Sequence, residues 1–193
     1  MKASDVISRG GVIAFRTDTF YGLGADPFNA AAVAHIRELK GRGDDKPILL
    51  LISDLAQTER LLVECSHEFK IAVQNFWPGP LTIAGKAVAT LPEEITAGTG
   101  TVGVRLPADQ SVRDLVAECG GVLTATSANP SGREPARSAQ EVAAYFPSGL
   151  DLIVDGGEVS ATEPSTVLDV SSSPPRVVRE GAIPRNVIEQ LFA

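Results

Sequence analysis

The chain has 193 residues, of which 44% are hydrophobic and 21% charged, as is typical of a globular domain. The net charge of -7 argues against a surface that coats nucleic acid, because such binding depends on neutralising phosphates. No apolar run is long enough to cross a membrane, and the amino terminus lacks the apolar core of a signal peptide. We therefore expect a cytoplasmic protein without membrane contacts, folded as a single domain over residues 1–193.

The hydrophobic pattern alternates between helix-like and strand-like segments. In chain order it predicts a helix at residues 4–8, a strand at 12–15, a helix at 30–40, a strand at 48–52, helical segments at 55–62 and 68–76, strands at 81–85 and 102–106, a helix at 111–119, a strand at 122–126, a helix at 142–146, strands at 152–155, 166–170 and 176–179, and a helix at 184–192. Asn29 is placed to cap the second helix, and Ser138 with Glu141 to form a capping box. Because the alternation is imperfect, we expect the α/β class with a mixed sheet and flanking helices.

A polar segment, residues 16–24, follows the first predicted strand. Its Thr17, Asp18 and Thr19 either bind a small polar ligand or hydrogen-bond their own backbone in a turn, and spacing alone leaves both interpretations open. The segment is neither a Walker A loop nor a GxGxxG fingerprint, so neither of those nucleotide-binding mechanisms applies.

Two further polar elements end a helix and a strand. Lys40 and Arg42 are either solvated cations favoured by the helix dipole or ligands of an anion. Ser127 and Asn129 follow a buried strand, which is where open α/β sheets bind their ligands. Two cations together with a hydroxyl and an amide suit a polyphosphate, because they balance charge and fix orientation at once.

Arg105 is predicted on a strand with apolar neighbours, so its charge needs a partner, either a carboxylate of the protein or one of a ligand. We find no Ser-His-Asp set and no paired carboxylates. Cys65 and Cys119 lie far apart, without metal-ligand spacing, and are predicted to be reduced and buried, with no protein metal site. This favours a reaction that depends on positioning and charge neutralisation, as nucleotidyl and phosphoryl transfer do.

Seven short segments follow one another along the chain: residues 17–24 (TDTFYGLG), 40–42 (KGR), 77–82 (WPGPLT), 102–107 (VGVRLP), 126–132 (TSANPSG), 165–167 (STV) and 179–183 (REGAI). In this order they resemble the YrdC-like threonylcarbamoyl-AMP synthase family. The resemblance covers nearly the whole chain and corresponds to the short, single-domain form of that family.

The resemblance implies a nucleotidyltransferase, an L-threonylcarbamoyladenylate synthase. Such an enzyme forms L-threonylcarbamoyl-AMP and pyrophosphate from L-threonine, bicarbonate or CO2, and ATP. The product would serve threonylcarbamoyladenosine modification of tRNA, with tRNA or tRNA-modification proteins as downstream partners. The implied fold is a twisted mixed β-sheet with flanking helices around a large concave cavity.

The resemblance also implies roles for particular residues. The implied ligands of the ATP phosphates, which also act in catalysis, are Lys40, Arg42, Ser127 and Asn129. The implied further contacts to the nucleotide are Thr101 and Arg179. The implied threonine ligands are Thr17, Arg105 and Ser165, with Arg105 pairing the carboxylate. Mg²⁺ would accompany ATP with few protein ligands.

Two alternatives remain open from the sequence. One is a module that binds double-stranded RNA or tRNA, and the other is a non-synthase YrdC paralogue, including hydrogenase-maturation proteins. The acidic charge weighs against the first, and the intact lysine–arginine and serine–asparagine pairs weigh against the second. The chain departs from the family pattern at Arg16, where proline is usual, and at Phe20, where a small β-branched residue is commoner.

Overall fold

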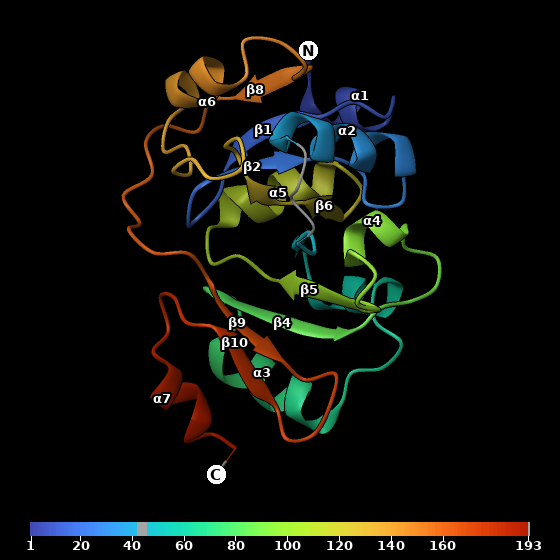
Figure 1. Cartoon of the computed structure of the whole chain (residues 1–193), viewed down its shortest axis with the longest axis vertical. Helices are drawn as coiled ribbons and strands as arrows, with labels where there is room; N and C mark the ends of the chain where they lie inside the picture. Colours follow the sequence, from blue (N-terminus) through green and yellow to red (C-terminus); the bar gives the residue numbers. More distant parts are fainter. Residues whose placement is uncertain (42–45, 193) are drawn as a thin grey trace.

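The computed structural model describes residues 1–41 and 46–192. Within these residues, ten strands form two mixed sheets, ordered β7-β2-β1-β8 and β10-β9-β4-β5-β3-β6. In Figure 1, β1, β2 and β8 lie in one half of the molecule and β4, β9 and β10 in the other. The predicted α/β class with flanking helices is confirmed, with the strands divided between two mixed sheets rather than joined in one.

The smaller sheet is built around a hairpin. Its strands are β1 (Ile13–Arg16), β2 (Tyr21–Gly24), β7 (Thr126–Ser127) and β8 (Leu152–Val154). β2 is antiparallel to β1, whereas β8 is parallel to it. The sequence analysis expected residues 21–24 to belong to a loop, and this was wrong. Two glycines obscured the strand pattern; at Gly24 a Cβ would lie 2.7 Å from the Phe15 ring, so the missing side chain makes room for Phe15.

The larger sheet contains two parallel pairs, β4 with β9 and β3 with β5, and antiparallel neighbours elsewhere. Its strands are β3 (Leu50–Ile52), β4 (Leu81–Lys86), β5 (Thr101–Arg105), β6 (Val122–Thr124), β9 (Thr166–Asp169) and β10 (Arg176–Arg179). Each lies within or close to a predicted strand. β3 is buried at every position, which explains its continuous apolar run, whereas β9 alternates between buried and partly buried residues.

The chain passes from one sheet to the other at Ala125. The predicted strand 122–126 is therefore broken: β6 ends at Thr124 in the larger sheet, and β7 begins after Ala125 in the smaller one. The Thr124 hydroxyl joins the two sheets, since it accepts from the Ala25 N–H at 2.8 Å and donates to the Leu23 carbonyl at 3.1 Å. This crossing carries Ser127 alongside β2.

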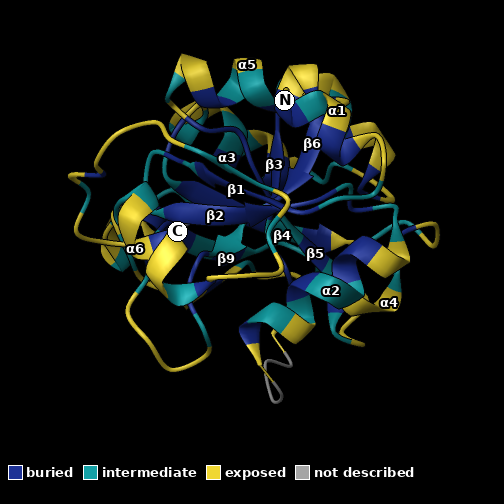
Figure 2. Cartoon of the chain, turned by 90° about the horizontal axis from the view of Figure 1, so that it is seen from above, coloured by how far each residue is buried: buried dark blue, intermediate teal, exposed yellow. Residues whose placement is uncertain are grey.

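Helices surround the buried strands, and Figure 2 shows their outer faces exposed. They are α1 (Ala3–Ile7), α2 (Ala30–Lys40), α3 (His67–Phe76), α4 (Glu93–Thr96), α5 (Gln110–Glu118), α6 (Ala139–Tyr145), α7 (Arg185–Glu189) and a 3-10 helix (Leu55–Arg60). The sequence analysis did not predict α4. The cap at Asn29 is confirmed, with its Oδ1 accepting from the Ala32 N–H at 3.2 Å. Ser138 caps α6, but the Glu141 carboxylate accepts from the Arg137 N–H rather than closing a capping box.

Both cysteines are free thiols, as predicted. Cys119 is buried, and burial raises the pKa of its thiol to about 11. Cys65 is only partly buried, so the prediction of burial holds for one of the two. No described helix combines the length and the apolar character that crossing a bilayer requires.

Candidate active site

A cavity of about 470 Å³ is lined by residues from both sheets. Its walls come from the β1–β2 hairpin, the end of α2, the end of β5, the segment after the sheet crossing, and the residues that open β9. Among the described residues that line it, one side chain is acidic, Glu134, and five are basic: Arg37, Lys40, Lys46, Arg105 and Arg179. This positive cavity lies in an acidic protein, so it is suited to an anionic ligand.

Lys40 ties two of the predicted motifs together. It is the last residue of α2 and is only 6% exposed. Its Nζ donates to the carbonyls of Ser127 at 2.8 Å and Asn129 at 3.1 Å, while the Ser131 N–H donates to the Lys40 carbonyl at 2.8 Å. The lysine and the serine–asparagine element therefore form one unit. Arg42, predicted as the second cation, lies outside the described residues.

Asn129 lines the cavity but uses its amide nitrogen within the protein. Nδ2 donates to the carbonyls of Pro130 and Arg133 at 3.0 and 2.7 Å. Its Oδ1 is buried and has no hydrogen-bond partner among the described residues. The side chain thus offers a ligand an acceptor rather than the donor that a phosphate contact needs.

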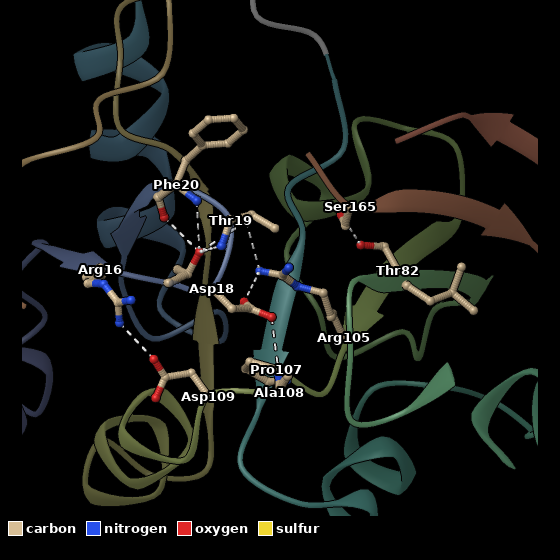
Figure 3. A network of polar contacts seen from close by, with 12 residues as sticks. Arg16, Asp18, Thr19, Phe20, Thr82, Arg105, Pro107, Ala108, Asp109 and Ser165 are labelled. Atoms are coloured by element: carbon tan, nitrogen blue, oxygen red, sulfur yellow. Dashed lines mark hydrogen bonds and ion pairs between the residues drawn. The ribbon is translucent and has the colours of Figure 1, made fainter. Parts of the chain in front are cut away.

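Arg105 ends β5 and is the largest fully buried side chain described, at 1% exposed. One terminal nitrogen lies 3.2 Å from Asp18 and donates to the Thr19 hydroxyl at 3.4 Å (Figure 3). Nε and the other terminal nitrogen have no hydrogen-bond partner among the described residues. Burial lowers the pKa of Arg105; Asp18 acts against this shift, and Arg179 adds to it. Buried donors without partners are costly, so this group is prepared for an anion.

Ser165 and Arg179 lie at the same end of the cavity. The Arg179 guanidinium donates to the Ser165 carbonyl at 2.8 Å and to its hydroxyl at 3.2 Å. The Ser165 hydroxyl also lies 2.8 Å from that of Thr82, as Figure 3 shows. Burial lowers the pKa of Arg179. The two predicted ligands, Ser165 and Arg179, thus contact each other, and the hydrogen bond with Thr82 holds the Ser165 hydroxyl in place.

Thr17 lines the cavity, but its hydroxyl is occupied by the turn. It donates to the Phe20 carbonyl at 2.7 Å and accepts from the Thr19 N–H at 3.1 Å. The structure shows the backbone-bonded turn, and the contact of Thr17 with threonine stays a prediction. The neighbouring Thr19 presents its hydroxyl toward Arg105 instead.

Thr101 is not brought to the cavity. It begins β5, at the opposite end from Arg105, and its hydroxyl lies 2.9 Å from that of Thr99. Its contact with the nucleotide stays a prediction that this placement does not support. The sequence analysis named Thr19 among the possible ligands of a small polar molecule but gave it no role in threonine binding, and it did not single out Glu134. Only the repeated threonine in TDT marks Thr19, and nothing in the local pattern marks Glu134.

Comparison with known proteins assigns the chain to relatives of similar fold. The family model Sua5_yciO_yrdC, described as "Telomere recombination", matches residues 5–181. The chain is 38% identical over 190 residues to the threonylcarbamoyl-AMP synthase of Pyrococcus abyssi, covering 98% of this chain and 56% of the relative. It is 37% identical to the synthase of the same name from Halorhodospira halophila, covering 86% of this chain and 87% of the relative.

Among solved structures, P. abyssi Sua5 complexed with L-threonine matches with a TM-score of 0.93 and 38% identity. That match covers 99% of this chain and 56% of the Sua5 chain. The chain therefore spans about half the length of the archaeal relative and most of the length of the Halorhodospira one.

Proposed function

The chain belongs to the Sua5/YciO/YrdC family, and we propose that it is an L-threonylcarbamoyladenylate synthase. It would form L-threonylcarbamoyl-AMP and pyrophosphate from L-threonine, bicarbonate or CO2, and ATP, in the cytoplasm. The product would pass to the machinery that modifies tRNA. Two of the relatives that carry this activity in their names match most of this chain.

The observation that carries the proposal is the cluster at the end of β5. Arg105 is buried with two nitrogen atoms that have no hydrogen-bond partner among the described residues, and Arg179 and Ser165 lie beside it. A buried guanidinium suits a carboxylate, because its charge and its planar donors attract and orient the bound group. We place the threonine carboxylate here.

The phosphates of ATP would lie toward Lys40 and the 127–131 segment, which share the cavity with Arg105. In the reaction, the threonine nitrogen bonds to the carbon of CO2 and loses a proton, giving a carbamate; when bicarbonate is the source, a carbon–oxygen bond breaks as well and water leaves. A carbamate oxygen then bonds to the α-phosphorus as the bond to pyrophosphate breaks. The protein's part is to hold both substrates in line and to neutralise developing charge.

Mg²⁺ bound with ATP would neutralise phosphate charge as pyrophosphate leaves. The residues after the sheet crossing fit such an ion, since Glu134 supplies a carboxylate and Asn129 a buried amide oxygen that no described residue hydrogen-bonds. The described residues contain no cluster of three or more His, Cys, Asp or Glu side chains, and a magnesium ion held mainly by phosphates and water requires none. We propose Glu134 and Asn129 as its protein ligands.

The test is pyrophosphate release from ATP, measured with and without L-threonine and bicarbonate, with L-serine and L-alanine as controls. We expect release that needs both co-substrates and strongly prefers threonine. Release that is indifferent to the amino acid, or its absence under all conditions, would refute the synthase assignment. Binding of duplex RNA at physiological salt in the second case would favour the RNA-binding alternative.

A further inference from the structure

Arg105 is held by one short segment. Both of its polar contacts among the described residues, to Asp18 and to the Thr19 hydroxyl, come from the turn between β1 and β2. The rest of this long side chain enters from β5, in the other sheet. Among the described residues, the turn therefore supplies the polar contacts that orient the guanidinium.

Asp18 is itself anchored on two sides. Its Oδ1 lies 3.2 Å from Arg105, and its Oδ2 accepts from the Ala108 N–H at 3.3 Å. The turn that carries it is closed by the Thr17 hydroxyl. Figure 3 shows the carboxylate between the arginine and the segment that follows β5. Oδ2 thus accepts a hydrogen bond from the segment after β5, while the buried Oδ1 meets Arg105 through charge at ion-pair distance.

The positive charge of Arg179 is the reason that Arg105 needs the Asp18 carboxylate. Arg179 lies close enough to Arg105 to disfavour its charged form, and its own hydrogen bonds go to Ser165. Without an anion, two guanidinium groups at one end of a buried cavity would move apart. Among the described residues, Asp18 is the carboxylate that forms an ion pair with either of them.

We propose that Asp18 is a positioning residue for this reaction: it fixes the Arg105 guanidinium in the orientation that receives the amino-acid carboxylate. Asp18 does not line the cavity, so it acts through Arg105 and not on the substrate. This inference rests on the proposed function, since it assigns the threonine carboxylate to Arg105.

A second ion pair also links the β1–β2 region to the segment that follows β5, so Asp18 is not alone in making this link. Arg16 and Asp109, whose side chains are 28% and 27% exposed, form an ion pair at 2.7 Å between β1 and the start of α5. It connects the same two parts of the fold, and neither residue lines the cavity. The Arg16–Asp109 pair is more exposed than the Arg105–Asp18 pair, and Arg105 lines the cavity whereas Arg16 does not. Asp109 is therefore a matched control for Asp18.

The decisive variant is Asp18→Asn. An amide carries no charge and presents one acceptor oxygen, so it cannot pair with the Arg105 cation while it also accepts from the Ala108 N–H. We expect the KM for threonine to rise about tenfold or more, because an oriented charged contact is lost, while the KM for ATP changes less than about threefold. Asp109→Asn should leave both values unchanged, since asparagine remains a good helix cap.

Thermal unfolding is measured for both variants, so that a general loss of stability is recognised. The coupling is then tested in an Arg105→Gln background, where Asp18→Asn should raise the threonine KM no further, because the residue it acts through is gone. An additive effect in the double variant would overturn the proposal. So would a lower threonine KM in Asp18→Asn, which would mean that the aspartate only competes with the substrate for Arg105.

Failure of the proposed function is distinguishable from failure of this inference. If the wild-type protein releases no pyrophosphate in response to threonine, the function is wrong. If the wild type is active and Asp18→Asn matches Asp109→Asn in both KM values, the function stands and the positioning role is refuted.

Discussion

The two ends of the cavity hold their buried cations in different ways. Lys40, at the end of a helix, donates to two neutral main-chain carbonyls. Arg105, at the end of a strand, forms an ion pair with Asp18 and keeps two nitrogen atoms without partners among the described residues. Neutral carbonyls fix the position of a charge without cancelling it, whereas a carboxylate cancels part of it.

The difference matches the two ligands that we propose. A polyphosphate carries several negative charges, and the lysine end places its cation against the main-chain carbonyls of the 127–129 segment. An amino acid at neutral pH carries no net charge, so the arginine end needs orientation more than attraction. Under the proposed function, the surroundings of each cation, more than the number of cations, would divide the cavity between nucleotide and amino acid.

Lys40→Ala should have the largest effect. The substitution removes a cation from the phosphate end and breaks the link to the 127–129 segment, so we expect turnover to fall by about a hundredfold to a thousandfold. The measurement is pyrophosphate release at saturating threonine. Lys86→Ala, exposed at the end of β4, is the control and should keep normal turnover. Turnover within about threefold of wild type in Lys40→Ala would remove the distinction between the two ends.

Arg105→Gln should act on one substrate only. We expect the KM for threonine to rise about a hundredfold and the KM for ATP to change little, because the bidentate partner of the carboxylate is lost. Steady-state kinetics with each substrate varied in turn measure this. An equal rise in both KM values would indicate that the two ends are not separate sites.

The two threonines of the turn should separate binding from folding. Thr19→Val should raise the threonine KM several-fold with little change in melting temperature, because its hydroxyl faces Arg105. Thr17→Val should lower the melting temperature, because its hydroxyl closes the turn and the loss leaves backbone groups unpaired. Thermal unfolding and threonine titrations on both variants check this. The reverse pattern would restore Thr17 as the ligand.

The smallest expected effect concerns the pH dependence of stability and the residue Asp109, which lies outside both ends of the cavity. A hydrogen bond from Ser111 and one from Arg16 lower the pKa of its carboxyl below the ordinary value. A carboxyl whose pKa is lowered on folding stabilises the folded state above about pH 4 and loses this contribution as the pH falls through its lowered pKa. Asp109→Asn should therefore flatten the decline of melting temperature below about pH 4 by a few degrees. A decline identical to wild type would contradict this, and activity at neutral pH should be unaffected.

The elements that sequence predicted well are those with a strong local signal. The helix 30–40 has its cap and its apolar spacing, and most predicted strands are uninterrupted apolar runs whose pattern survives folding. β2 escaped prediction because Tyr21–Gly24 alternates with glycine, and its partner strands β1 and β7 determine its conformation. The break at Ala125 was not predicted for the same reason, since β6 ends there because the next residues pair with β2 in the other sheet.

By itself, the sequence determined the fold class and the order of the motifs, and it indicated a positively charged site for a phosphate-bearing ligand. Those properties depend on residue types and short spacings. Only the tertiary structure decided that Thr19 faces Arg105 while the Thr17 hydroxyl closes the turn, that Asn129 uses its amide nitrogen internally, and that Thr101 lies away from the cavity. The reason is physical: the partner of a hydroxyl, amide or guanidinium is set by contacts between residues up to about a hundred positions apart, such as Arg105 with Asp18 and Lys40 with Ser127.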